Sequence, residues 1–108
     1  MPRRSTSDAF SRAIGARIRA LREEAGLTME KLAYESELGS KGHLSNLERG
    51  LVHPTAHTLK VIADRLGVLP LDLLTFPDVD DRQRLIDHTR GLNREHWRAL
   101  LRELDSKT

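Results

Sequence analysis

Glycine and proline interrupt this 108-residue chain so often that it can form only short elements of secondary structure. The interruptions fall at Gly26, Gly39, Gly50, Pro54, Gly67, Pro70, Pro77 and Gly91. Between them, apolar residues recur three or four positions apart, which is the spacing of an amphipathic helix. Because no segment alternates apolar and polar residues as a half-buried strand does, we expect an all-α fold.

These apolar stripes, together with residues that favour helix N-caps, predict seven helices. The first carries a stripe from Phe10 to Ala25 and ends at Gly26. The next four correspond to residues 29–36, 41–49, 56–66 and 70–74. The last two run from the aspartates at 78–81 to about Arg90, and from residue 94 to about 104. The expected N-caps are Thr28, Ser40, Thr55 and Asn93.

The segment Thr75-Phe76-Pro77 marks the expected boundary between two parts of the chain. We assign residues 1–10 to a basic N-terminal arm, 11–76 to a five-helix domain and 77–108 to a two-helix C-terminal extension. The extension carries more large apolar side chains than a solvated tail needs, namely Leu85, Ile86, Trp97, Leu100, Leu101 and Leu104. They either fold back onto their own domain or pair with a second chain, and we expect pairing as a dimerisation element.

The composition argues against several classes of protein. The chain has no cysteine, which rules out disulfide scaffolds, thiolate zinc sites and cysteine nucleophiles. It has no apolar run near the roughly 18 residues of a membrane span, and no phosphate loop or nucleophile–base pair. His53 and His57 are four residues apart, but Pro54 lies between them and no carboxylate completes a metal site. We expect a soluble, cytoplasmic protein that is not an enzyme and needs no cofactor.

Positive charge gathers at the N-terminal end, although the formal net charge is only +2. Residues 1–22 hold six arginines against one aspartate, whereas the chain from Gly67 onward is close to neutral. Such asymmetry is typical of a polyanion-binding end. Arginines also suit the solvated face of a helix, so charge alone does not decide between the two interpretations.

The predicted helices 29–36 and 41–49 are joined by a four-residue turn that contains Gly39. Two short helices across such a turn form a helix-turn-helix, whose second helix enters the major groove of DNA. On a helical wheel, Leu44 and Leu47 define the inner side of the second helix. The opposite side carries Gly42, Ser45, Asn46 and Arg49. Such a face suits base edges and phosphates, although it also suits a helix that only faces solvent.

Several segments resemble the lambda-repressor/Cro-like helix-turn-helix family, often called XRE, over roughly residues 11–75. They are residues 14–28 (IGARIRALREEAGLT), Leu32-Ala33, residues 44–50 (LSNLERG), Pro54-Thr55 and the stretch from Leu59 to Val68. The resemblance implies a five-helix domain that binds double-stranded DNA as a homodimer and usually represses transcription. It would place the protein at the nucleoid.

The resemblance also implies roles for individual residues. By position, the residues that face the bases are Lys41, Gly42 and Asn46. Together with the outer face and the basic first helix, it assigns contacts with the DNA backbone to Arg19, Thr28, Ser40, His43, Ser45 and Arg49.

One ion pair is expected inside the domain. Glu48 lies about 40° from Leu44 on the wheel, towards the core, where an unpaired carboxylate is costly. Arg22 flanks the apolar stripe of the first helix, and the resemblance brings the two residues together. We therefore predict an Arg22–Glu48 ion pair that ties the recognition helix to the first helix.

Three functions compete at this point. The leading one is a sequence-specific DNA-binding repressor that recognises an inverted-repeat operator as a homodimer. The second is an adaptor that keeps the fold but binds proteins, with Met29 and Leu51-Val52 as its apolar contact surface. The third is the antitoxin of a toxin–antitoxin pair, whose toxin binds residues 78–108. A protein antagonist or co-regulator is a further expected partner, and a membrane is not.

Overall fold

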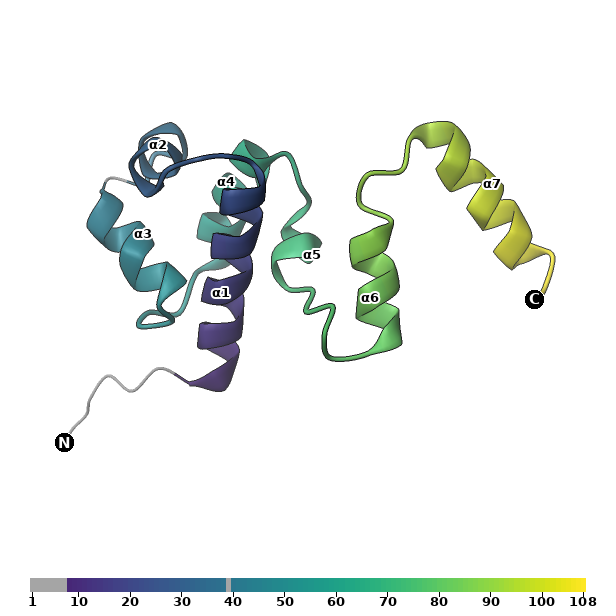
Figure 1. The fold of residues 1–108 in the computed structure, drawn as a ribbon, viewed down its shortest axis with the longest axis horizontal. Helices are drawn as coiled ribbons and strands as arrows, with labels where there is room; N and C mark the ends of the chain where they lie inside the picture. The colour runs from purple at the N-terminus through teal and green to yellow at the C-terminus, as the bar shows by residue number, and fades with distance from the viewer. Residues whose placement is uncertain (1–7, 39) are drawn as a thin grey trace.

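The computed structural model describes residues 8–38 and 40–108, and within them all regular structure is helical. The helices are α1 (Ala9–Glu24), α2 (Met29–Glu35), α3 (Lys41–Glu48), α4 (Ala56–Leu66), α5 (Pro70–Leu73), α6 (Asp81–His88) and α7 (Arg94–Asp105) (Figure 1). The expected all-α class, with five helices followed by two further ones, is therefore confirmed. Most of the expected basic arm, residues 1–7, lies outside the described residues.

Side-chain caps begin six of the seven helices. In each of these, the N-cap oxygen accepts a hydrogen bond from the backbone N–H three residues on, as the expected Thr28, Ser40, Thr55 and Asn93 do. Asp8 and Asp80 cap α1 and α6 in the same way. The cap at Asp80 makes α6 start at Asp81, three residues later than the acidic run had indicated, and α6 ends at His88.

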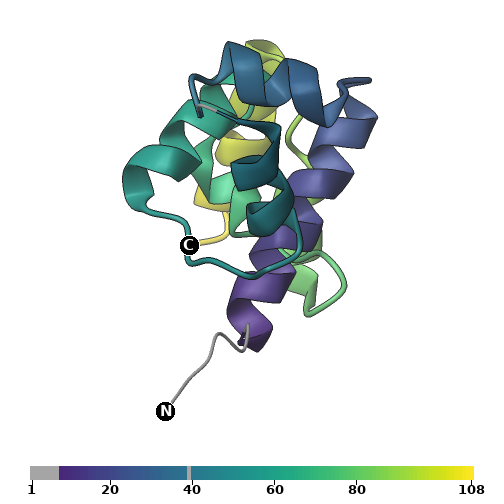
Figure 2. The same ribbon diagram turned by 90° about the vertical axis from the view of Figure 1, so that its left-hand side faces the viewer.

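The core is formed by α1 to α5. Its centre consists of fully buried side chains from all five helices, including Ile18, Leu32, Leu44, Ile62 and Leu73. Removing such a side chain from water contributes roughly 1.5–3 kcal/mol. Figure 2 views the molecule from the side of α2 and α3, which lie across α1.

Helices α1 and α3 approach each other closely at Gly15. A Cβ atom placed there would lie 2.8 Å from the carbonyl carbon of Glu48, and closer still to the carbonyl oxygen of Leu47. Only glycine therefore lets α3 sit this close to α1. This contact sets the position of the predicted recognition helix.

The extension has a different character from the core. Every residue of α6 and α7 is at least partly exposed, and α7 projects away from the rest of the molecule (Figure 1). The molecule consequently measures 55 × 31 × 21 Å, with a radius of gyration of 16.0 Å. A compact chain of this length has a radius of gyration of about 13 Å. Within the described part of the chain, no helix has both the length and the apolar character needed to cross a bilayer.

Candidate nucleic-acid interface

The turn between α2 and α3 gives the pair its helix-turn-helix geometry. Glu37 adopts a left-handed conformation with φ of 56°, and the Leu38 N–H donates to the carbonyl of Ala33 at 3.1 Å. Leu38 packs against the core and so anchors the turn. The glycine on which the sequence argument rested, Gly39, lies outside the described residues. Ser40 then starts α3 by accepting a hydrogen bond from the N–H of His43 at 3.1 Å.

Helix α3 presents one buried side and one outer side. Leu44 and Leu47 are buried, whereas Lys41, Gly42 and His43 are exposed at its N-terminal end. Further along the outer side, Ser45 and Asn46 are half-buried and Arg49 is exposed. A Cβ atom at Gly42 would have a single neighbour within 4 Å in the described structure, the Ser40 hydroxyl at 3.8 Å. The N-terminal end of α3 is thus open to a large ligand.

Lys41 takes part in an ion pair that the sequence did not predict. Its Nζ donates to Glu30 Oε2 at 3.1 Å, which links the first turn of α3 to the first turn of α2. The backbone amide of Glu30 and the ammonium of Lys41 lower the pKa of the Glu30 carboxyl. Both side chains are more than half exposed, so the pair stabilises the free protein little and separates easily. Its two members lie on different helices, so no local spacing identifies it.

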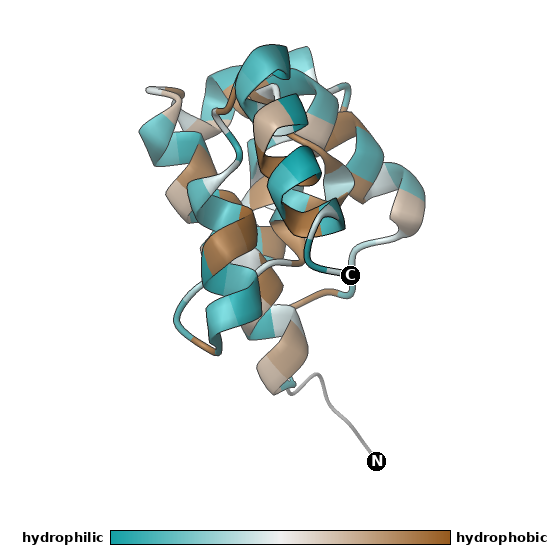
Figure 3. Cartoon of the chain, turned by 90° about the vertical axis from the view of Figure 1, so that its right-hand side faces the viewer, coloured by the Kyte–Doolittle hydropathy of each residue, from teal (hydrophilic) through white to brown (hydrophobic). Residues whose placement is uncertain are grey.

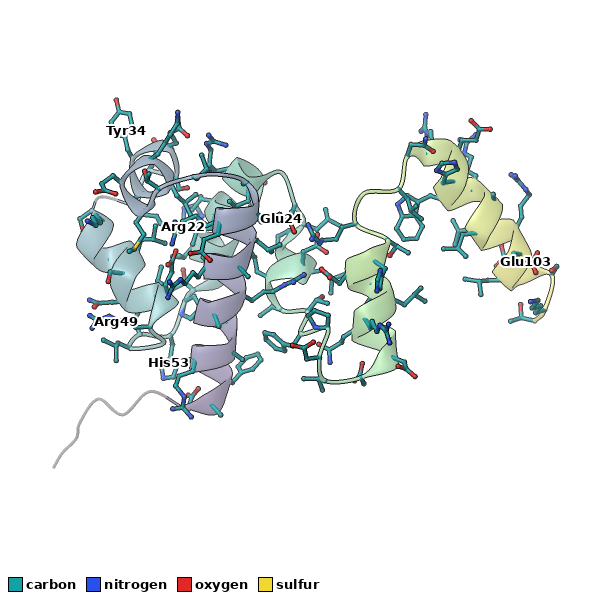
Figure 4. The ribbon with its side chains drawn as sticks, in the orientation of Figure 1. Arg22, Glu24, Tyr34, Arg49, His53 and Glu103 are labelled. Atoms are coloured by element: carbon teal, nitrogen blue, oxygen red, sulfur yellow. The ribbon has the colours of Figure 1, made fainter. Side chains whose placement is uncertain are left out.

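Asn46 and Arg49 are linked on the outer side of α3. Arg49 Nη2 donates to Asn46 Oδ1 at 3.0 Å, and Figure 4 shows Arg49 at the C-terminal end of the helix. The spacing of three residues places both side chains on one face, and this signal was available in the sequence. The bond orients the Asn46 amide and leaves its two N–H donors free of this contact. The predicted base-reading amide and a predicted phosphate-binding cation therefore form one unit.

Arg22 and Glu48 hold α3 against α1. Arg22 Nε donates to Glu48 Oε2 at 2.7 Å, and Arg22 Nη2 donates to Glu48 Oε1 at 3.1 Å. Arg22 Nη1 also donates to the carbonyl of Leu27 at 2.7 Å. The hydrogen bond to Glu48 raises the pKa of Arg22 above its ordinary value. Because this pair is bidentate and buried, the orientation of α3 is rigidly set from inside the domain.

The remaining predicted backbone contacts lie at separate places on the surface. Thr28 is the exposed N-cap of α2 and accepts from the N–H of Lys31 at 3.0 Å. Arg19 is an exposed residue of α1, and its Nε donates to Glu23 at 3.3 Å. Thr28 belongs to the helix-turn-helix itself, whereas Arg19 is paired within α1.

The loop after α3 is attached to the start of α1. Ser11 Oγ lies 2.7 Å from His53 Nδ1, and the same nitrogen lies 3.6 Å from Asp8. A hydrogen bond from the backbone N–H of Ser11 lowers the pKa of Asp8. Both neighbours approach the same ring nitrogen, unlike a catalytic triad, in which opposite nitrogens of the histidine join the acid and the nucleophile.

The same loop contains Leu51 and Val52, two of the three residues that the sequence suggested as an apolar contact surface. Gly50 has φ of 74°, and a Cβ atom there would lie 2.6 Å from the Cα atom of Arg12. Of the apolar pair that follows, Val52 packs against the core and Leu51 remains exposed. Met29 is also partly buried against the core, so these residues do not form one exposed apolar surface.

In residues 8–38 and 40–108, no three metal-ligating side chains come together.

Comparison with known proteins gives concordant results. A family described as "Helix-turn-helix domain" matches residues 13–76. The HTH-type transcriptional regulator y4dJ of Sinorhizobium fredii, itself uncharacterized, is 42% identical over 65 residues, which cover 60% of this chain and 83% of that protein. The restriction-modification controller protein C.AhdI from Aeromonas hydrophila superimposes with a TM-score of 0.59 and 30% identity, over 61% of this chain and 98% of that one.

A second solved structure extends beyond the helix-turn-helix domain. In the complex of the SinR protein with the SinI protein, the matched chain superimposes with a TM-score of 0.62 and 25% identity. The match covers 87% of this chain and 96% of that one. The structural match therefore includes part of this chain's extension as well as its five-helix domain.

Proposed function

This chain belongs to the helix-turn-helix family of DNA-binding transcriptional regulators, and from that premise we propose that it is a repressor that binds an inverted-repeat operator as a homodimer. One observation carries the proposal. The outer side of α3 is open at Lys41 and Gly42, bears the linked Asn46 and Arg49, and is held from behind by a buried ion pair. A rigid helix with small, amide and cationic side chains on its free side fits the major groove.

Sequence discrimination in this proposal comes from Asn46 and Lys41. A bidentate contact with a base edge contributes about 1–3 kcal/mol of discrimination. Lys41 reaches a base or phosphate once it leaves Glu30, at small cost because their ion pair is exposed. Gly42 lets the backbone approach the DNA. Phosphate contacts by Thr28, Ser40, His43, Ser45, Arg49 and Arg19 add affinity without sequence information.

The homodimer in this proposal is formed through the extension. Leu85, Trp97, Leu101 and Leu104 are exposed apolar side chains of α6 and α7, and Ile86 and Leu100 are half-buried beside them. Two-fold pairing would present two α3 helices to half-sites about 34–36 Å apart. The same apolar side chains give a protein antagonist or co-regulator a place to bind.

Selection of bound sequences from a random DNA pool tests this proposal. We expect enrichment of an inverted repeat, and a binding constant that falls steeply with salt concentration. The variant Asn46→Ala should lose preference at one or two positions of each half-site while retaining affinity for the backbone. Enrichment of no sequence, with weak binding at all salt concentrations, would favour a protein-binding adaptor. Unaltered preference in Asn46→Ala would remove that residue from the reading surface.

A further inference from the structure

An apolar groove of about 690 Å³ lies where the domain meets the extension. The ends of α1 and α4 and the start of α5 form one wall, and α6 and the first turn of α7 form the other. Leu69 and Leu71 line the first wall and are 63% and 52% exposed, although both are large apolar side chains. Ile86 and Trp97 line the second wall. A groove with this apolar lining suits the apolar face of a helix.

Helix α7 carries an unpartnered apolar face. Trp97, Leu100, Leu101 and Leu104 fall within about 100° of the helical wheel, and three of them are exposed. Figure 3 views the molecule from the end where α6 and α7 lie, with apolar residues in brown. The adjacent side of α7 carries three arginines that form no ion pair within the described part of the chain, Arg94, Arg98 and Arg102.

We infer that α7 of a second copy occupies this groove, and that the exchange is reciprocal, an inference that rests on the homodimer of the proposed function. Trp97 belongs both to the wall of the groove and to the apolar stripe of α7. The two surfaces are therefore continuous on one side of the molecule. A single two-fold operation then covers both groove and stripe on each copy, as an isologous interface requires.

The charges of the two surfaces are complementary. Helices α1 and α4 both end at the groove, and helix C-termini carry partial negative charge. The lining also holds two carboxylates, those of Glu24 and Asp72, against the one guanidinium of Arg90, which donates to both oxygens of Glu24. The arginines beside the stripe of α7 bring the opposite charge to this rim.

The surface area buried also favours a contact between α7 and the groove over a contact between two α7 helices alone. Four large side chains present on the order of 400 Å², so two stripes facing each other bury less than the roughly 1,200–2,000 Å² of a stable interface. Two reciprocal contacts between α7 and a groove bury both stripes and both grooves, which about doubles that area.

The chain's own α7 does not fill its own groove. The Thr89 N–H donates to the backbone carbonyls of Leu85 and Ile86, and the Leu92 N–H donates to the carbonyl of Thr89 at 3.2 Å. The connection from α6 to α7 is therefore a tight turn. This turn leaves Trp97 at the groove and directs the C-terminal end of α7 away from it (Figure 1).

Cross-linking of the full chain tests the inference, because the natural sequence contains no cysteine. Leu69→Cys and Leu101→Cys proteins with different mass tags are mixed and treated with a short bismaleimide. We expect a mixed dimer in severalfold excess over the dimer from Leu101→Cys alone. The control is Val79→Cys mixed with Leu101→Cys, since Val79 is 67% exposed but lies away from the groove.

Three results would overturn the groove contact. Equal cross-linking of Leu101→Cys with itself would show that the tails pair with each other. A cross-link within one chain in the Leu69→Cys/Leu101→Cys double variant would show that α7 folds back. Mixed dimers no more abundant than in the Val79→Cys control would show that the groove is empty in solution.

Sedimentation of charge variants gives an independent measurement. We expect Arg98→Glu/Arg102→Glu to weaken dimerisation severalfold, whereas Arg84→Glu, on the exposed side of α6, leaves it unchanged. Equal effects of the two changes would contradict the charge argument. DNA selection is measured separately. A cross-linked dimer that selects no DNA sequence would refute the proposed function alone, and operator binding without the mixed cross-link would refute the groove contact alone.

Discussion

The side chains of Arg22 and Glu48 are 9% and 5% exposed, so removing either leaves a buried charge without its partner. Breaking such a pair costs about 3–5 kcal/mol of stability. We expect Glu48→Ala to lower the free energy of unfolding by about 3 kcal/mol in urea denaturation. Glu23→Ala is the control, because Glu23 forms an exposed pair with Arg19 and its loss should change stability little. Equal stability of the two variants would mean that the Arg22–Glu48 pair is open in solution.

Gly15 and Gly42 differ in what surrounds them. Substitution at Gly15 should reduce stability, whereas substitution at Gly42 should reduce DNA binding. A methyl group at Gly15 overlaps the backbone of α3, so Gly15→Ala should destabilise the fold by about 1–3 kcal/mol. Among the described residues, a Cβ atom at Gly42 would meet only the Ser40 hydroxyl, at 3.8 Å, so Gly42→Leu should leave the melting temperature nearly unchanged but abolish tight operator binding. Thermal denaturation and a DNA titration of both variants check this contrast. Tight operator binding by Gly42→Leu would show that the protein backbone at this residue does not approach the DNA closely.

At the scale of elements, ion pairs and a hydrogen bond link α6 and the residues that follow it to the domain. Arg17 Nη2 donates to Asp87 Oδ1 at 2.7 Å, and Arg90 Nε donates to the same oxygen at 2.9 Å. Gln83 Oε1 accepts from the N–H of Phe76 at 2.8 Å. Figure 4 shows Glu24, the other partner of Arg90, on the side of α1 that faces α6. The position of α6 therefore depends on the ionisation of Asp87.

The hydrogen bond from Arg17, followed by that from Arg90, lowers the pKa of Asp87 in the folded protein. An unfolded aspartate has a pKa of about 3.9, so the contact stabilises the fold fully above that pH and is lost as the pH falls through the lower folded pKa. We expect acidification below about pH 4 to release α6. The single tryptophan, Trp97, reports this as a red shift of its fluorescence.

Asp87→Asn is the matched variant for this measurement. Its tryptophan emission should already be red-shifted at neutral pH and should change less on acidification. Circular dichroism at 222 nm distinguishes release of α6 from unfolding of the whole chain. A wild-type emission that shifts only together with loss of helicity would contradict separate release.

At the scale of the whole molecule, the core cluster draws its buried residues from α1 to α5. A chain that ends at Phe76 should therefore remain folded, with a helical circular dichroism spectrum and a cooperative thermal transition. It should sediment as a monomer and bind an operator less tightly than the full chain. Binding of one subunit to its half-site no longer holds a second subunit near the other half-site. A short chain that stays dimeric and binds equally well would show that the extension is not the dimerisation element. The exposed Leu51 beside α3 would then be the better candidate.

The sequence by itself determined the local features of this protein. Helix N-caps and apolar residues at helical spacing act within a few positions of each other, which is why all seven helices and most of their ends follow from the order of residues. The inward angle of Glu48 likewise indicated that it needs a partner, and Arg22 lies 2.7 Å from it. No pattern in the sequence indicated that Glu37 adopts a left-handed conformation, because few non-glycine residues do so.

Only the tertiary structure decided which charged residues meet and which apolar surfaces stay open. Charged residues make up 31% of the chain, so the partners of Lys41, Asp87 and Glu24 cannot be chosen from spacing when they lie on other helices. The apolar groove arises in the same way, because its walls come from separate helices whose side chains meet only after packing. Local periodicity shows that a side chain is apolar or charged, whereas the packing of helices determines what it contacts.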